Sequence, residues 1–183
     1  MPEPRLLLAQ LEQAWRAGPS EALESLHAAI LQRLEVLPAT DELRLLIVQV
    51  RLSRAGNLAL LGRHETAELL FAGIHEALAG LPDRPAVRLQ QARLHANRAA
   101  NRIVLGQRDL AGNLLALAQD LFDELPDSPS IRMRRARVRS NRAANLCALG
   151  RHDEAETLYA QALALFDALD DSRRARVPGA RLR

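Results

Sequence analysis

The segment Ile131–Asn145, IRMRRARVRSNRAAN, contains six arginines and two asparagines. Guanidinium groups form two-point hydrogen bonds with carboxylates and phosphates, and an asparagine amide can donate and accept at once. The segment could therefore bind an acidic protein segment, bind a nucleic acid, or neutralise acids on its own chain. It contains no aromatic residue on which single-stranded bases could stack. An acidic protein segment is the favoured ligand, and the other two alternatives stay open.

The same polar residue types recur elsewhere in the chain at a spacing of 44 residues. One register holds Arg54, Arg98 and Arg142, and another holds Asn57, Asn101 and Asn145, with Gln10 and Gln13 in the first unit. A third register holds Ser53, Asn97 and Asn141, and a fourth holds Arg44, Arg88 and Arg132. Glycine keeps the same period at Gly18, Gly62, Gly106 and Gly150, and Leu-Pro does so at 37–38, 81–82 and 125–126. Such a fixed period indicates a repeat architecture.

Each unit is predicted to form a helix, a glycine turn, a second helix and a stop at Leu-Pro. The predicted first helices are 4–17, 40–61, 84–105 and 128–149, and the second helices are 20–37, 64–81, 108–125 and 152–169. The Ala-, Leu- and Arg-rich composition favours helices throughout. We therefore expect an all-α fold with one domain over residues 1–170, in units of about 1–38, 39–82, 83–126 and 127–170. Residues 171–183 are predicted to form a basic, flexible tail.

The stretch ALGRHDEAETLYAQAL resembles the turn and second helix of a tetratricopeptide repeat (TPR), with Gly150 followed by Ala155, Tyr159 and Ala162. The third unit keeps Gly106, Ala111 and Ala118 at these positions, and the second unit keeps Gly62, Ala67 and Phe71. The period is longer than the usual one and is similar to that of long-repeat variants such as kinesin light chain. The resemblance implies a right-handed superhelical array of antiparallel helix pairs, an α-solenoid. The chain departs from the family pattern where Arg54, Arg98 and Arg142 replace the usual leucine.

The resemblance also implies a function, because in such arrays the first helices line a concave groove that holds an extended peptide. It predicts a protein–protein interaction scaffold or adaptor that binds an acidic peptide or protein segment in a basic groove. The predicted peptide-binding residues are Arg54, Asn57, Arg93, Asn97, Arg98, Asn101, Arg137, Asn141, Arg142 and Asn145. The alternatives are a helical repeat protein that binds nucleic acid through its arginine-rich first helices, and a structural subunit of a larger regulatory or secretion complex.

Charge separates by helix type in the second half of the chain. Segment 83–105 has five arginines against one aspartate, and segment 127–149 has six against one. Segments 107–125 and 151–169 each have one arginine against four acids. A groove lined by first helices would therefore be basic. The same separation also allows the repeated arginines to pair with acids on a neighbouring second helix, and the repeated asparagines to cap or bridge backbone groups between units.

Catalysis and metal binding are not expected. The five histidines have no metal-ligand spacing, Cys147 is the single cysteine, and the glycines do not cluster into a phosphate-binding loop. Neither Ser140 nor Cys147 has an adjacent base. We therefore predict a protein that is not an enzyme and has no cofactor or metal.

The last predicted helix has more apolar residues than one partner helix can cover. Leu158, Leu165, Phe166 and Leu169 are predicted to dock onto a second copy, giving a homodimer, or onto another protein. The N-terminus has no secretory signal pattern and no stretch has about 18 consecutive apolar residues, so the chain is predicted to be cytoplasmic, with no membrane partner. The net charge of +3 is too small to indicate a nucleic-acid partner by itself.

Overall fold

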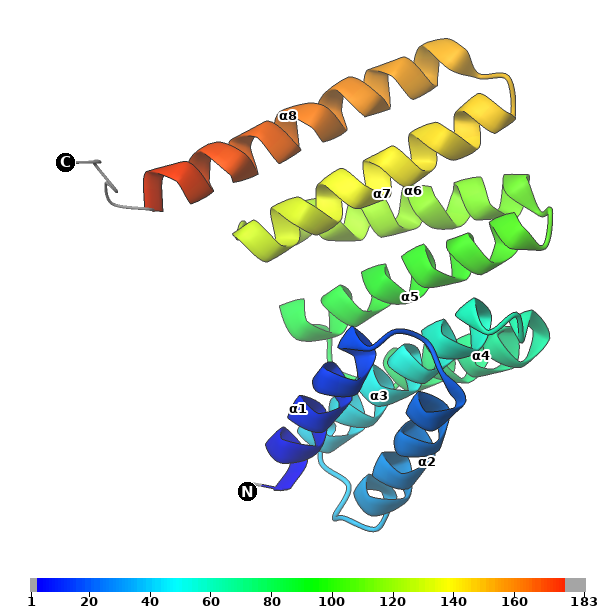
Figure 1. Cartoon of the computed structure of the whole chain (residues 1–183), viewed down its shortest axis with the longest axis vertical. Helices are drawn as coiled ribbons and strands as arrows, with labels where there is room; N and C mark the ends of the chain where they lie inside the picture. Colours follow the sequence, from blue (N-terminus) through cyan, green and yellow to red (C-terminus); the bar gives the residue numbers. More distant parts are fainter. Residues whose placement is uncertain (1–2, 177–183) are drawn as a thin grey trace.

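The computed structural model describes the backbone of residues 3–176 and the side chains of residues 6–170, and this part of the chain is all-helical, as predicted (Figure 1). Its helices are α1 (Glu3–Arg16), α2 (Glu21–Glu35), α3 (Asp41–Leu60), α4 (His64–Ala79), α5 (Pro85–Val104), α6 (Arg108–Glu124), α7 (Pro129–Ala148) and α8 (His152–Arg176). Helix α8 continues six residues into the predicted tail, and the rest of that tail, 177–183, lies outside the described residues.

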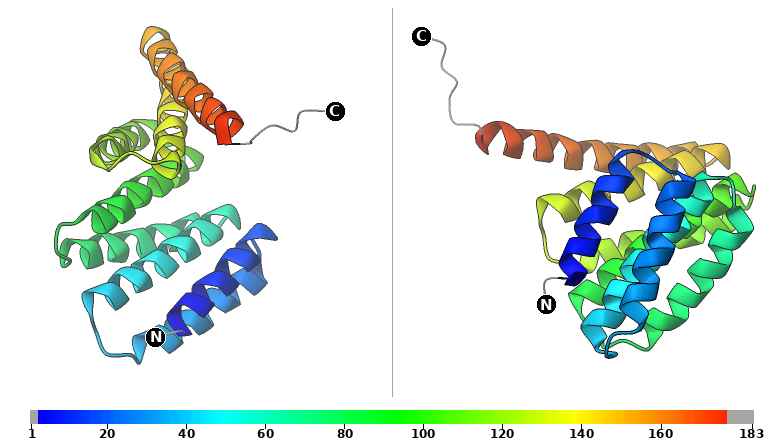
Figure 2. Two further views of the ribbon diagram at one scale, coloured as in Figure 1. Left: turned by 90° about the vertical axis from the view of Figure 1, so that its left-hand side faces the viewer. Right: turned by 60° about the horizontal axis from the view of Figure 1, so that its bottom comes forward.

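The helices are connected as four hairpins, and each helix contacts the next one along the chain. Figures 1 and 2 show α1 and α2 at one end of the molecule and α8 at the other, with the middle hairpins between them. The inner hairpins therefore have a neighbour on each side, whereas the end hairpins have a neighbour on one side. No helix in residues 3–176 has both the length and the apolar character needed to cross a membrane.

Three of the periodic glycines end their helices by the same hydrogen-bonding pattern. At the first of them, Gly62, φ is 79°, its N–H donates to the Ala59 carbonyl oxygen, and the Arg63 N–H donates to the Leu58 carbonyl oxygen at 2.9 Å. This is the Schellman arrangement, in which a residue in the left-handed region lets two terminal carbonyls of the helix accept hydrogen bonds. Gly106 and Gly150 repeat it. The 44-residue spacing of these three glycines therefore reflects the same helix-ending turn in three successive units.

Replacing Gly62 with alanine is expected to lower the free energy of unfolding by about 1–2 kcal/mol, since a Cβ disfavours the left-handed region. Gly73 is the matched control, because it lies inside α4 and an added Cβ there meets no atom within 4 Å. Gly73→Ala should instead raise the stability by roughly 0.5–1 kcal/mol. Urea unfolding followed by circular dichroism measures both. Equal effects of the two substitutions would contradict this account of the turn.

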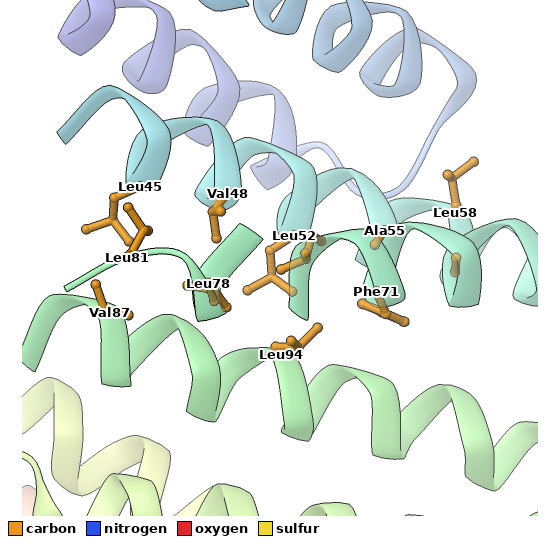
Figure 3. Close-up of a cluster of buried hydrophobic side chains, with 12 residues drawn as sticks. Leu45, Val48, Leu52, Ala55, Leu58, Phe71, Leu78, Leu81, Val87 and Leu94 are labelled. Atoms are coloured by element: carbon orange, nitrogen blue, oxygen red, sulfur yellow. The ribbon is translucent and has the colours of Figure 1, made fainter. Parts of the chain in front are cut away.

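Three successive core clusters each include residues of one hairpin and of the next first helix, and a fourth contains residues of α7 and α8. The cluster in Figure 3 contains Leu52 from α3, Phe71 and Leu78 from α4, and Leu94 from α5. Phe71 is fully buried there. The apolar face of an inner second helix is thus covered by its own first helix and also by the first helix of the following unit.

Candidate functional site

The asparagines of the 57/101/145 register lie inside the array, at the start of the preceding unit's second helix. Asn57 Nδ2 donates to the Ser20 carbonyl oxygen at 3.1 Å, and the Ser20 N–H donates to Asn57 Oδ1 at 3.0 Å. Asn101 and Asn145 donate in the same way to the carbonyl oxygens of His64 and Arg108. The three side chains are at most 2% exposed. The prediction that Asn57, Asn101 and Asn145 contact a peptide is therefore corrected, since they bridge neighbouring units.

The arginines of the 54/98/142 register also bond within the array. Arg54 Nε donates to Glu24 Oε1 at 2.7 Å, and Arg98 Nε donates to Glu68 Oε2 at 3.0 Å. Each carboxylate lies 30 residues before its arginine, on the preceding second helix.

In the last unit the position 30 residues before the arginine is Gly112, and Arg142 instead donates to Gln119 Oε1 at 3.1 Å. Arg54, Arg98 and Arg142 are thus engaged within the chain, which corrects their assignment to the peptide-binding set.

Most of the arginines in the Ile131–Asn145 segment are bonded to neighbours. Arg132 pairs with Asp127, and Arg139 Nη2 lies 2.7 Å from Asp123 Oδ2. Arg135 contacts both aspartates and donates to the backbone carbonyl oxygens of Phe122, Asp123 and Leu125. Self-neutralisation therefore accounts for part of the segment's charge.

Arg134 and Arg137 differ from these neighbours, because neither has a hydrogen bond or ion pair with any described residue. Both line a pocket of about 360 Å³ between α5 and α7. Its lining residues are Arg93, Ala96, Asn97, Ala100, Phe122, Ser130, Met133, Arg134, Arg137, Val138 and Asn141. The pocket thus brings together four predicted site residues, Arg93, Asn97, Arg137 and Asn141. Its lining contains three arginines and no acid.

The positive charges of the arginines that line this basic pocket repel one another. Burial, with a contribution from the nearby charge of Arg134, lowers the pKa of Arg93 to about 10. Burial and the charge of Arg137 lower the pKa of Arg134. Both groups remain protonated at neutral pH. The hydrogen bond of Arg93 goes to a neutral acceptor, the amide oxygen of Gln90, at 2.9 Å. An anion that enters the pocket would relieve this repulsion.

The pocket has polar and apolar sides that could contact different parts of a ligand. Asn97 and Asn141 supply amides, and Ser130 supplies a hydroxyl. Met133, Ala96 and Ala100 supply an apolar surface, whereas Phe122 and Val138 are at most 3% exposed. The arrangement can therefore bind a carboxylate together with an adjoining apolar group.

Sequence reasoning missed Arg134, Ser130, Met133 and Phe122 as site residues. The available signal was a difference between units, because the register of Arg134 holds Leu46 and Gln90 in earlier units. The positions equivalent to Arg137 in the earlier units likewise hold Gln49 and Arg93. Positive charge accumulates where α5 meets α7 since both registers become basic there.

The predicted oligomerisation residues divide into two sets. Leu158 and Leu169 are buried within the chain, which corrects their assignment to a docking surface. Leu165 and Phe166 are half-buried. Among the described residues no group of three or more His, Cys, Asp or Glu side chains could hold a metal ion.

Comparison of the chain with protein-family models gives no match, and comparison with curated proteins gives none either.

Proposed function

We propose that this chain is a TPR-like scaffold, a right-handed superhelical array of helix pairs, that binds an acidic peptide or protein segment in the basic pocket. The observation that supports this most strongly is the contrast among its arginines. Arg54, Arg98 and Arg132 are bonded to carboxylates of the chain, whereas Arg134 and Arg137 have no such partner among the described residues. An acidic ligand would supply the missing carboxylates. The role is to hold a partner in the cytoplasm, without catalysis.

The pocket lining favours a peptide over a small inorganic anion. Arginine forks bind carboxylates in two-point geometry, and the amides of Asn97 and Asn141 can donate to and accept from a peptide backbone. Met133, Ala96 and Ala100 offer contact to an apolar side chain. A volume of about 360 Å³ suits a few side chains of an extended segment. We therefore expect a ligand with Asp or Glu next to an apolar residue.

The lining also argues against nucleic acid as the main ligand. Single-stranded binders stack bases on exposed aromatic rings. The one aromatic residue of the lining, Phe122, is 3% exposed, so it offers no stacking surface.

The test is a fluorescence anisotropy titration with three labelled probes in several salt concentrations. One probe is a short peptide of alternating Asp or Glu and Leu, the second replaces each acid by its amide, and the third is a single-stranded oligonucleotide. The acidic peptide should bind at least about tenfold more tightly than the amide peptide, since one charged hydrogen bond contributes roughly 1.5–3 kcal/mol. Tighter binding of the oligonucleotide, with a steep linear dependence of log K on log salt, would contradict the proposal.

A further inference from the structure

The exposed face of α8 repeats the face by which α4 is held to α5. The two helices are two repeat periods apart, so each residue of α8 corresponds to the α4 residue 88 positions earlier. His152 corresponds to His64, Glu156 to Glu68, Tyr159 to Phe71, and Phe166 to Leu78. The same polar pair and the same aromatic or apolar positions therefore occur on both helices.

On α4 this face is bound by α5 through hydrogen bonds of Arg98 and Asn101 and through the apolar side chain of Leu94. Arg98 Nε donates to Glu68 Oε2 at 3.0 Å, and Asn101 Nδ2 lies 3.0 Å from Glu68 Oε1. Asn101 also bonds the backbone carbonyl of His64 and, at 2.7 Å, its ring nitrogen. Leu94 packs in the same cluster as Phe71 (Figure 3). About two turns of α5, from Leu94 to Asn101, thus cover this face.

On α8 no helix of the described chain takes the place of α5. Tyr159 is 43% exposed, whereas its counterpart Phe71 is fully buried. Leu163 on the same helix is 61% exposed. Glu156 is exposed and has no hydrogen bond or ion pair with a described residue, whereas Glu68 is bonded to both Arg98 and Arg102. The face has an unpaired acid beside apolar side chains.

We propose that this face of α8 binds a helix of a partner protein that has an apolar residue, arginine four residues later and asparagine three residues after that. The chain itself uses this pattern at each of its inner junctions, with Val50, Arg54, Asn57, then Leu94, Arg98, Asn101, then Val138, Arg142, Asn145. The arginine of the partner helix would pair with Glu156, its asparagine would bond the start of α8 at His152, and its apolar residue would cover Tyr159. This surface is separate from the basic pocket.

A second copy of the chain is a poorer occupant. The register-equivalent residues of α1 are Leu6, Gln10 and Gln13. The apolar position is present, and Leu6 is 61% exposed. Glutamine is uncharged, however, so Gln10 cannot neutralise Glu156 as arginine neutralises Glu68. Charge complementarity therefore selects a foreign helix with arginine.

The test uses a labelled peptide of residues 85–104, the sequence of α5, added to the full chain in an anisotropy titration. Saturable binding is expected, and Glu156→Arg in the protein should weaken it at least about tenfold. The peptide variant Arg98→Glu should bind the wild type weakly and the Glu156→Arg protein tightly, which restores the pair with its charges exchanged. Glu154→Gln is the control because Glu154 bonds Arg151 at the turn, and it should change the affinity less than twofold.

Three results would overturn the proposal. The first is that the peptide does not bind, and the second is that the Glu154 and Glu156 variants weaken its binding equally. The third is that the protein self-associates with increasing concentration and that this association is lost when Gln10 and Gln13 are replaced by alanine. The last result would assign the face to a second copy. None of these outcomes bears on the acidic-peptide titration, because the peptide 85–104 has four arginines and no acid and is repelled by the basic pocket.

Discussion

The double variant Arg134→Gln/Arg137→Gln is expected to bind an acidic peptide about 100-fold more weakly than the wild type. Each arginine would contribute a charge-assisted hydrogen bond of roughly 1.5–3 kcal/mol, so the loss of two corresponds to at least about two orders of magnitude in Kd. The substitution keeps side chains that can form hydrogen bonds, so the loss reports charge rather than shape. Isothermal titration calorimetry with the acidic peptide measures the effect.

The control is Arg88→Gln/Arg132→Gln, which removes the same number of charges from α5 and α7, the two helices between which the pocket lies. Arg88 and Arg132 are bonded to Asp83 and Asp127 on the surface, outside the pocket. Their loss should change the affinity less than threefold. Equal weakening by both double variants would mean that the ligand responds to the net charge of the array, and the pocket would lose its assigned role. The stability of the pocket variant should not fall, because Arg134 is partly buried beside the like charges of Arg93 and Arg137.

Asn101→Ala is expected to lower the free energy of unfolding by about 2–4 kcal/mol. The buried amide bonds the His64 carbonyl, the His64 ring and Glu68, and its loss leaves these groups without their partner inside the protein. An unsatisfied buried polar group costs roughly 1–3 kcal/mol, and more if it is charged. Chemical unfolding in urea measures the change.

The other asparagines give a graded control series for this prediction. Asn145→Ala should cost less than Asn101→Ala, because Asn145 has one hydrogen bond and its Oδ1 atom has no partner among the described residues. Asn141→Ala should be almost neutral, since Asn141 is exposed in the pocket. A loss of stability as large for Asn141 as for Asn101 would contradict the division between bridging and pocket asparagines.

The helices could be predicted from the sequence because their ends depend on local chemistry. Gly62 and its repeats occupy the left-handed region and end the first helices, and Leu-Pro ends the second helices. Both signals lie within a few residues of the helix end that they determine, so they can be read from the local sequence. The predicted helix 84–105 accordingly matches Pro85–Val104 within one residue at each end. The end of α8 was less predictable, since no glycine or proline precedes Arg176 closely.

The site was predicted only in part, because periodicity shows which residues share a register and not what they contact. Asn97 and Asn101 lie one turn apart on α5, yet the first lines the pocket and the second bonds His64 on the preceding unit. Contacts 30 and 37 residues back along the chain decide this, and they depend on how neighbouring hairpins pack. Arg134 was missed for the opposite reason, since it does not repeat at all.

The most direct test of the basic pocket is an NMR titration that follows the side-chain Nε–Hε signals of the arginines as an acidic peptide is added. We expect the signals of Arg93, Arg134 and Arg137 to shift together and to saturate at one peptide per chain, while those of Arg54 and Arg98, which are already bonded to Glu24 and Glu68, stay unchanged. Shifts at Arg54 and Arg98, or saturable binding that leaves the three pocket signals in place, would contradict the account.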